Sequence, residues 1–352
     1  MIAIDFFSGA GGLTRGLLNA GVSVIAGLDA NPDCQKTFEA NNAPARFITT
    51  DIRRLKAADV KKLVKGVDRK DLLFAACAPC QPFSKQRVQR RNSAAKTLLG
   101  SFSNLVFAIK PGHVLVENVP GLAKVRGEST YRRFRKMLIN AGYKVSERII
   151  DAKHFGVPQT RRRLVVFASR YFDPSLPEPT HGPEKRAYAT VRDAIAKFPP
   201  LTAGACAKTV PNHRASALSP LNLERIKNTP KNGGDRRSWP KRLRLLCHAD
   251  GYSGHTDVYG RMWWNRPAPA LTGRCDSLSN GRYGHPRQNR AISLREAAAL
   301  QSFPDNYVFY GPSKNSIALQ IGNAVPVKMA ERLGRHILKI RNESAGKRSK
   351  NN

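Results

Sequence analysis

Short apolar runs alternate with stretches of helical composition over the first 170 residues of the chain. The runs that predict strands are rich in β-branched and aromatic residues: 2–7, 22–29, 71–76, 113–118, 144–151 and 163–169. Between several of them lie helical segments, such as 129–142. This alternation predicts βα units and a mostly parallel, doubly wound α/β sheet. The nearly continuous apolar run at 113–118, HVLVEN, is typical of a strand buried on both faces.

Beyond residue 172 the pattern changes. The stretch 173–185 is rich in proline and charge and indicates a domain boundary, and the residues after it show little regular period. Helical patterns return at 293–303 and 325–340. The expected parts are an α/β domain at 1–174, a smaller loop-rich domain at 175–285, C-terminal helices at 286–340 that return to the first domain, and a basic disordered tail at 341–352.

The charge of the chain points to an anionic partner. Lysine and arginine number 60 against 25 acidic residues, a net charge of +35. Nucleic acid is the commonest surface that such an excess faces, although a solvated basic surface is the simpler alternative. The first residues have no basic segment followed by a long apolar one, and no run is long enough for a membrane span, so we expect neither a signal peptide nor a membrane anchor. Six scattered cysteines make no disulfide framework, so we expect a reduced, cytoplasmic protein with no membrane partner.

A glycine-rich turn follows the first predicted strand, in DFFSGAGGLTRGL at 5–17. Such a turn lets the backbone approach a ligand at the strand's carboxyl end, although an ordinary tight turn is the alternative. It lacks the dinucleotide fingerprint because position 14 is threonine, and it is no P-loop. Asp29 and Asp51 end the next two strands, suited to ribose hydroxyls and an adenine amino group. A nucleoside cofactor without a pyrophosphate, such as S-adenosylmethionine, fits better than NAD.

The segment CAPCQPFSKQR at 77–87 could hold a redox pair, half of a metal site or one reactive thiol. Pro82 would break a helix begun at Cys77, which disfavours the redox pair. The other cysteines offer no second close pair, so we expect no metal site. The remaining interpretation is a rigid loop that presents Cys80 as the single reactive thiol. Cys77 is then a bystander, and Cys77→Ala is expected to stay active.

A reactive thiol needs positively charged surroundings, and it needs an acid that neutralises the charge on the group it attacks. Glu117 ends the strand at 113–118, and arginines at 161–163 precede the strand at 163–169. Taken alone, Glu117 could be an ordinary carboxylate at a strand end, and the arginines could be ordinary surface charge. All of them are expected at the edges of one sheet, which favours a shared site.

These motifs together resemble the DNA (cytosine-5) methyltransferases. The similarity is carried, in the family's order, by DFFSGAGGL, GLDANPDC, TTDIRRL, PCQPFS, ENVPGL, QTRRRL, SLREAAALQSFPDNY and QIGNAVPVKMA. It implies a Rossmann-like class I methyltransferase sheet over 1–174 that binds S-adenosylmethionine, and a target-recognition domain over 175–285. Two departures stand out: the family usually has glycine and proline where this chain has Cys77 and Ala78, and some members carry an aromatic residue at the position of Ala30.

The resemblance also implies site residues. The catalytic positions are Cys80, Glu117, Arg161 and Arg163, whereas Asn118 supports the glutamate loop and Gln159 is structural. The cofactor-binding positions are Phe7, Gly9, Ala10, Gly12, Asp29, Asp51, Ile52, Pro79, Asn323 and Val325. We expect DNA contacts from the basic segment after Cys80, which suits a lid, and from the loop-rich domain: Ser84, Arg87, Arg236, Thr272, Arg274, Asn280 and Arg282.

The resemblance implies methyl transfer to C5 of a flipped-out cytosine in double-stranded DNA through a bond between Cys80 and C6. The expected protein is a monomer near the bacterial nucleoid, either an orphan methylase or one with a cognate restriction endonuclease. Two alternatives stay open: an RNA cytosine methyltransferase on the same scaffold, and a non-catalytic DNA-binding regulator, which the presence of all catalytic groups disfavours. A NAD-dependent dehydrogenase is disfavoured by the missing fingerprint.

Overall fold

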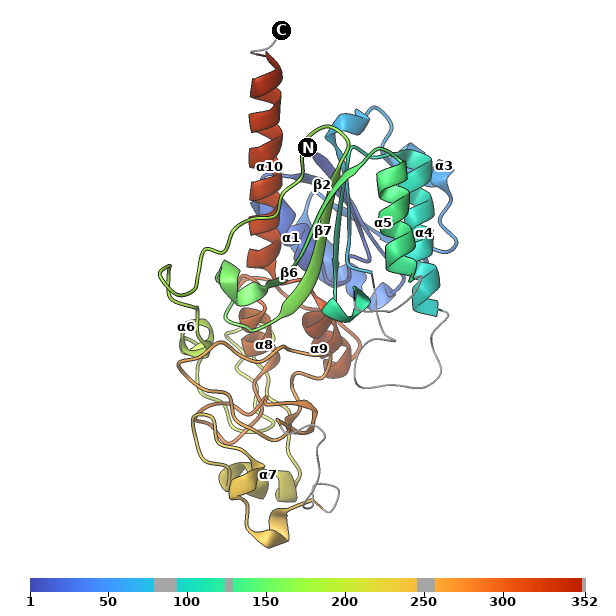
Figure 1. Cartoon of the computed structure of the whole chain (residues 1–352). Coiled ribbons are helices and arrows are strands. Elements are labelled where there is room, and N and C mark those ends of the chain that lie inside the picture. Colours follow the sequence, from blue (N-terminus) through green and yellow to red (C-terminus); the bar gives the residue numbers. More distant parts are fainter. Residues whose placement is uncertain (79–93, 124–128, 246–256, 350–352) are drawn as a thin grey trace. The chain divides into compact units, whose positions relative to one another are not determined.

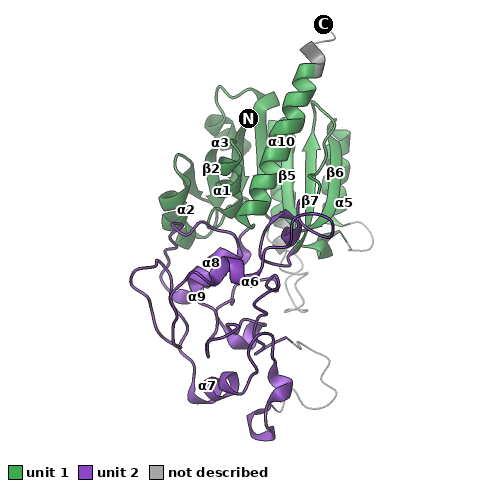
Figure 2. Cartoon of the chain, turned by 90° about the vertical axis from the view of Figure 1, so that its left-hand side faces the viewer, with its two compact units in different colours: residues 1–151, 162–179, 325–352 green, residues 152–161, 180–324 purple. Residues whose placement is uncertain are grey.

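The computed structural model describes residues 1–78, 94–123, 129–245 and 257–349, and the chain divides into two compact units (Figure 1, Figure 2). Unit 1 comprises 1–151, 162–179 and 325–352, and unit 2 comprises 152–161 and 180–324. These boundaries differ from the predicted ones. The chain returns to unit 1 only from residue 325, so the helices expected to return together are divided between the two units.

Unit 1 is built on a single sheet whose seven strands, among the described residues, lie in the order β3-β2-β1-β4-β5-β7-β6. The strands are β1 Ile2–Phe6, β2 Ser23–Asp29, β3 Arg46–Thr49, β4 Leu72–Ala76, β5 His113–Asn118, β6 Lys144–Asp151 and β7 Arg162–Ser169. The first five pair in parallel, whereas β7 runs antiparallel to both β5 and β6. The predicted doubly wound α/β class is confirmed, and the antiparallel pair is the feature that the apolar pattern did not reveal.

The central strands are apolar because both of their faces are covered. Every residue of β4 and β5 is buried, as the near-continuous apolar run of HVLVEN predicted. Three aromatic rings, of Phe6, Phe74 and Phe102, pack together in the core of this unit, with ring centroids 4.9 and 5.2 Å from that of Phe6. Burial of this kind gives the carboxyl ends of β1, β4 and β5 a rigid base.

The described helices of unit 1 are α1 Gly12–Asn19, α2 Gln35–Asn42, α3 Ala57–Leu63, α4 Ala94–Ile109, α5 Thr130–Asn140 and α10 Val327–Ser349. Helix α10 lies along α1, and two glycines allow this close packing (Figure 2). A Cβ on Gly16 would lie 2.3 Å from the Cβ of Ala330, and one on Gly334 would lie 2.7 Å from that of Ala20. The C-terminal segment is therefore part of the sheet domain's own packing.

Helix α10 also continues where the sequence favoured a disordered tail. It extends to Ser349, well beyond residue 341. The tail contains no proline, and the ion pair between Lys339 and Glu343, 3.8 Å apart at i,i+4 spacing, supports the exposed end of the helix. Polar composition alone did not distinguish a solvated helix from disorder. Among the described residues, no helix is long and apolar enough to cross a membrane.

Unit 2 contains little regular structure, as the sequence predicted for its loop-rich part. Its described helices are short: α6 Val191–Ile195, α7 Pro220–Lys227, α8 Leu294–Leu300 and α9 Lys314–Asn323. Loops are tied together by the buried Arg261, whose guanidinium donates to the backbone carbonyls of Ile226, Thr229 and His285 at 2.7–3.0 Å. These hydrogen bonds to main-chain oxygens act beside a small apolar cluster of the same unit, which includes Trp239 and Tyr259.

Candidate active site

The turn after β1 has an unusual backbone. Phe7, Gly9 and Gly11 all have positive φ, at 60°, 50° and 85°. Glycine adopts this left-handed region without strain, whereas Phe7 is held there by the surrounding structure. Ala10 and Gly12 are buried in the same turn, which continues directly into α1. The turn therefore brings backbone to the carboxyl end of β1, as predicted.

Asp29, at the end of β2, is fixed against this turn. Its Oδ2 accepts a hydrogen bond from the amide of Gly9 at 2.9 Å, and its Oδ1 accepts one from the amide of Asn31 at 2.8 Å. Burial raises the pKa of the Asp29 carboxyl, and these two amides act in the opposite direction. Each oxygen keeps further acceptor capacity for a ligand.

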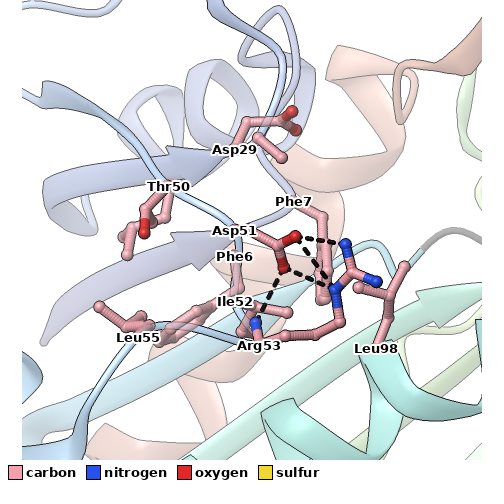
Figure 3. A pocket seen from close by; sticks show the side chains of 11 residues that line it. Phe6, Phe7, Asp29, Thr50, Asp51, Ile52, Arg53, Leu55 and Leu98 are labelled. Carbon is pink, nitrogen blue, oxygen red and sulfur yellow. Dashed lines mark hydrogen bonds and ion pairs between the residues drawn. The ribbon is translucent and has the colours of Figure 1, made fainter. Parts of the chain in front are cut away.

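A pocket of about 590 Å³, including its open mouth, lies beside Asp29 at the ends of β1, β2 and β3 (Figure 3). Its lining is mostly apolar, with two carboxylates and one guanidinium: Phe6, Phe7, Leu28, Asp29, Ala30, Thr50, Asp51, Ile52, Arg53, Leu55 and Leu98. Apolar walls and a fixed carboxylate suit a purine nucleoside. The pocket thus fits the nucleoside cofactor that the sequence implied.

Four of the ten predicted cofactor positions line this pocket: Phe7, Asp29, Asp51 and Ile52. Val325 is buried in unit 1, whereas Asn323 is the exposed last residue of α9 in unit 2. Pro79 lies outside the described residues. The two acids lie together because Asp29 ends β2, Asp51 follows β3, and these strands end at the same edge of the sheet.

Arg53 is a pocket residue that sequence reasoning missed. Its Nε lies 2.9 and 3.0 Å from the two carboxylate oxygens of Asp51, and its Nη2 completes a two-point ion pair (Figure 3). This pair lowers the pKa of Asp51 to about 2. An adenine amino group would share this carboxylate with Arg53. The TTDIRRL motif contains Arg53, two residues beyond Asp51, but nothing in the pattern indicated the pairing.

Asp5, beneath the turn, is a buried carboxyl with a strongly altered pKa. It accepts a hydrogen bond from the Thr14 hydroxyl at 2.6 Å, and its Oδ1 accepts none from the described residues. Burial raises the pKa of Asp5 to about 7. Because the folded protein then holds this proton more tightly than the unfolded chain, the group's contribution to stability falls as pH rises from about 4 to about 7.

We therefore expect Asp5→Asn, which mimics the protonated acid, to flatten the decline in unfolding free energy over that pH interval. One proton accounts for at most about 1.4 kcal/mol per pH unit. Urea unfolding at pH 4.5, 5.5 and 6.5 measures the slope, with the exposed Asp173→Asn as the charge-matched control. Equal slopes for Asp5→Asn and the native protein would contradict the assignment.

Glu117, at the end of β5, lies in a group of side chains from three strand ends. Its Oε1 is 2.9 Å from Nε of Arg163, and its Oε2 accepts a hydrogen bond from the thiol of Cys77 at 2.9 Å. The Arg163 contact is an ion pair without hydrogen-bond geometry, so Oε1 accepts no hydrogen bond from the described residues. Both partners are shielded, since the side chains of Glu117 and Arg163 are only 4 and 15% exposed.

Asn118 connects this carboxylate to the cysteine loop. Its side-chain amide donates to the carbonyl oxygen of Ala78 at 2.9 Å, and its Oδ1 accepts from the amide of Val119 at 2.8 Å. The sequence assigned Asn118 to the glutamate loop, whereas its side-chain amide bonds the segment that contains Cys77 and Ala78. Cys80 itself lies outside the described residues.

Arg161 belongs to unit 2 and is buried there. Its two terminal nitrogens donate to the carbonyl oxygens of Leu271 and Gly322 at 2.9 and 3.0 Å. Gln159 likewise accepts from the amide of Leu271 and donates to Gln301 Oε1. The structure thus places Arg161 in a network that joins distant segments of unit 2, whereas Arg163 contacts the site carboxylate in unit 1.

The residues expected to contact DNA differ in exposure. Arg274 is exposed, whereas Arg236, Thr272 and Asn280 are half-buried. Arg282 is buried and bonded to Asp257 and to the carbonyl oxygens of Gly233 and Arg261. The predicted base contact from Arg282 is therefore corrected: its guanidinium is committed to the protein. Ser84 and Arg87 lie outside the described residues.

The sheet order, with β7 antiparallel between β5 and β6, and the pocket at the ends of β1–β3 define a Rossmann-like methyltransferase fold. A similar fold is seen in the crystal structure of a DNA modification methyltransferase encoded within an E. coli prophage. That structure has a TM-score of 0.71 at 21% identity and covers 97% of this chain and 99% of its own.

The chain belongs to the family of C-5 cytosine-specific DNA methylases, whose family model matches residues 1–339. Type II methylase M.HgiDII of Herpetosiphon aurantiacus is 38% identical over 338 residues, which are 95% of this chain and 94% of the relative. Type II methyltransferase M1.HphI of Haemophilus parahaemolyticus is 33% identical over 341 residues, 96% of this chain and 86% of the relative. The protein is accordingly a DNA (cytosine-5) methyltransferase.

Proposed function

We propose that the protein transfers a methyl group from S-adenosylmethionine to C5 of a flipped-out cytosine within a specific double-stranded DNA sequence. The observation that carries this proposal is the arrangement at the ends of β4, β5 and β7. A shielded carboxylate, Glu117, is held by Arg163 and tied through Asn118 to the loop that leads to Cys80. These are the acid, the positive charge and the thiol that attack on a cytosine ring requires.

The proposed reaction begins with a bond between the thiolate of Cys80 and C6 of the cytosine. Glu117 delivers a proton to N3, so the electron pair displaced from the ring is neutralised and C5 becomes nucleophilic. C5 then takes the methyl group as the bond from that methyl to the sulfonium sulfur breaks and leaves a neutral thioether. A base removes the C5 proton, the Cys80–C6 bond breaks to release the thiolate, and the N3 proton returns to Glu117, which restores the ring. C6 is not accessible within a duplex, and the base must therefore leave the stack.

Arg163 has two tasks in this scheme. Its contact with Oε1 fixes the Glu117 carboxyl, and its positive charge favours the charge that develops on the ring where water is excluded. Because both side chains are shielded, these interactions are stronger than they would be in open solvent.

The cofactor supplies an electrophilic methyl group on a sulfonium when it is bound. The residues that would hold it are those of the turn and the adjoining pocket, with Asp29 for the ribose and Asp51 for the adenine amino group. Leu28 and Ile52 line the same pocket and would pack against the nucleoside. We further infer a cytoplasmic monomer near the nucleoid that acts either as an orphan methylase or beside a cognate restriction endonuclease that is a separate protein.

Methyl transfer from labelled S-adenosylmethionine to genomic DNA tests this function, and bisulfite sequencing of the product identifies the methylated sequence. The expected result is 5-methylcytosine at one short sequence. Methylation of RNA, with none on duplex DNA, would show that the substrate is RNA. Absence of any methyl transfer, from protein that binds DNA, would favour a regulator.

Arg274 is our candidate for a base-reading side chain, because it is exposed on the loop at 272–286 between residues that are anchored. Gly273 packs tightly against Leu319, and Cys275 is buried. We expect Arg274→Ala to cost about 1–3 kcal/mol at one base position and to relax the choice of base there. Methylation rates on substrates with each base in turn measure this effect.

The control is Lys241→Ala, since Lys241 is an exposed cation in the same unit. Loss of a phosphate contact at Lys241 would weaken all sequences alike. If Arg274→Ala also lowered every rate equally and left the methylated sequence unchanged, base reading by Arg274 would be excluded.

A further inference from the structure

We propose that Cys77 is a positioning residue for the acid Glu117, and that its thiol fixes this carboxyl relative to the loop that bears Cys80. The inference rests on the proposed function, since it assigns a task within that reaction. The sequence interpretation gave Cys77 no role. The 2.9 Å hydrogen bond from its sulfur to Oε2 of Glu117 speaks against a bystander.

The first support is the register of the sheet. Strands β4 and β5 pair in parallel, and their last backbone pair joins Ala76 to Val116. The next residues in register are Cys77 opposite Glu117 and then Ala78 opposite Asn118. Beyond the last backbone pair, side chains make the connections: Cys77 donates to the carboxyl of Glu117, and Asn118 donates to the carbonyl of Ala78.

The second support is that Cys77 is fixed from its other side. Its amide donates to the carbonyl oxygen of Phe6 at 3.2 Å and so extends the pairing of β4 with β1. The thiol therefore sits on a backbone that is held by the neighbouring strand. A donor on a fixed backbone restricts the carboxyl more than a donor on a flexible side chain does.

The third support is that the two carboxyl oxygens of Glu117 have different partners. Oε2 is bound by the Cys77 thiol, whereas Oε1 faces Arg163 without a hydrogen bond from the described residues. The thiol is the donor in this contact, so Oε2 is occupied. Oε1 is then the oxygen that meets the base and carries the proton for N3, and the bond at Oε2 prevents rotation of the carboxyl away from that orientation.

The family's usual residue at this position, glycine, has no side chain to make the contact. The contact between Cys77 and Glu117 therefore depends on the cysteine of this chain. Its loss is expected to change the rate of methyl transfer and not the binding of DNA. If the orientation that this hydrogen bond gives the carboxyl is needed in the transition state, loss of the bond should lower kcat by about 10-fold.

The experiment compares Cys77→Ala and Cys77→Ser in the full-length protein, with Cys206→Ala, an exposed free thiol in unit 2, as the control for thiol loss. The alanine variant should lose about 10-fold in kcat with KM for DNA within about 2-fold. Serine keeps a donor on the same backbone and should restore most of the rate. The rate of adduct formation with 5-fluorocytosine DNA should follow the same order.

Three results would overturn the inference: native rates in both Cys77 variants, an equal loss in alanine and serine, or a change confined to KM. Thermal unfolding of each variant shows whether it is folded, and Cys77→Gly provides the contact-free comparison if the alanine variant fails to fold. A native protein without methyltransferase activity would contradict the proposed function instead, so the two failures remain distinguishable.

Discussion

Replacing Cys80 with alanine is expected to lower kcat by at least about 10⁴-fold, because the ring has no other nucleophile to add at C6. Binding of duplex DNA should persist, since the positive charge of the protein is unchanged. A filter-binding assay and a methyl-transfer assay on the same preparation separate the two properties.

The covalent bond itself can be observed with DNA that carries 5-fluorocytosine at the target. C5 then has no proton to lose, so the bond to C6 persists and peptide mapping locates it. We expect the adduct on Cys80 in the native protein and in Cys77→Ala, and none in Cys80→Ala. An adduct on Cys77, or none on the native protein, would contradict the assignment of the nucleophile.

The sheet was largely predictable from the sequence because its strands are short, apolar and separated by helical stretches. The order of the strands was not, since an antiparallel β7 between β5 and β6 depends on pairing between distant segments. Helix α9 was missed for a related reason. Its sequence, KNSIALQIGN, has little amphipathic period. Its buried residues pack against other parts of unit 2, among them helix α8.

The site residues likewise fall into those that the local sequence pattern indicated and those that depend on tertiary structure. Asp29 and Glu117 lie in the last residues of β2 and β5, and Asp51 lies just after β3, so the strand pattern alone placed all three at one edge of the sheet. Arg282 was misjudged because composition does not distinguish an exposed arginine from a buried one that binds carbonyl oxygens. The contact of Cys77 with Glu117 depends on a register of two strands 40 residues apart, which no local pattern encodes.

Buried arginines also refine what the net charge means for DNA binding. Arg261 and Arg295 lie in the interior of unit 2 and donate chiefly to main-chain carbonyls, and burial lowers the pKa of each to about 10, so both stay charged at neutral pH. Arg290, by contrast, is paired with the carboxylate of Glu296. The excess of +35 therefore includes cations that support the loops and cannot contact phosphate.

The remaining surface excess is still large enough to dominate affinity, and we expect binding to non-target duplex to depend steeply on salt. A protein that makes about 6–10 phosphate contacts loses about 10³–10⁵ in affinity between 50 and 200 mM salt, because each contact releases counterions from the DNA. The slope of log K against log salt measures the number of contacts. Substituting one exposed contact, for which Lys241→Ala is the candidate, should reduce the slope by about 1. Arg261→Met would instead destabilise the fold, because Arg261 is buried among carbonyl oxygens. A flat salt dependence would show that the charge excess serves solubility and that affinity arises elsewhere.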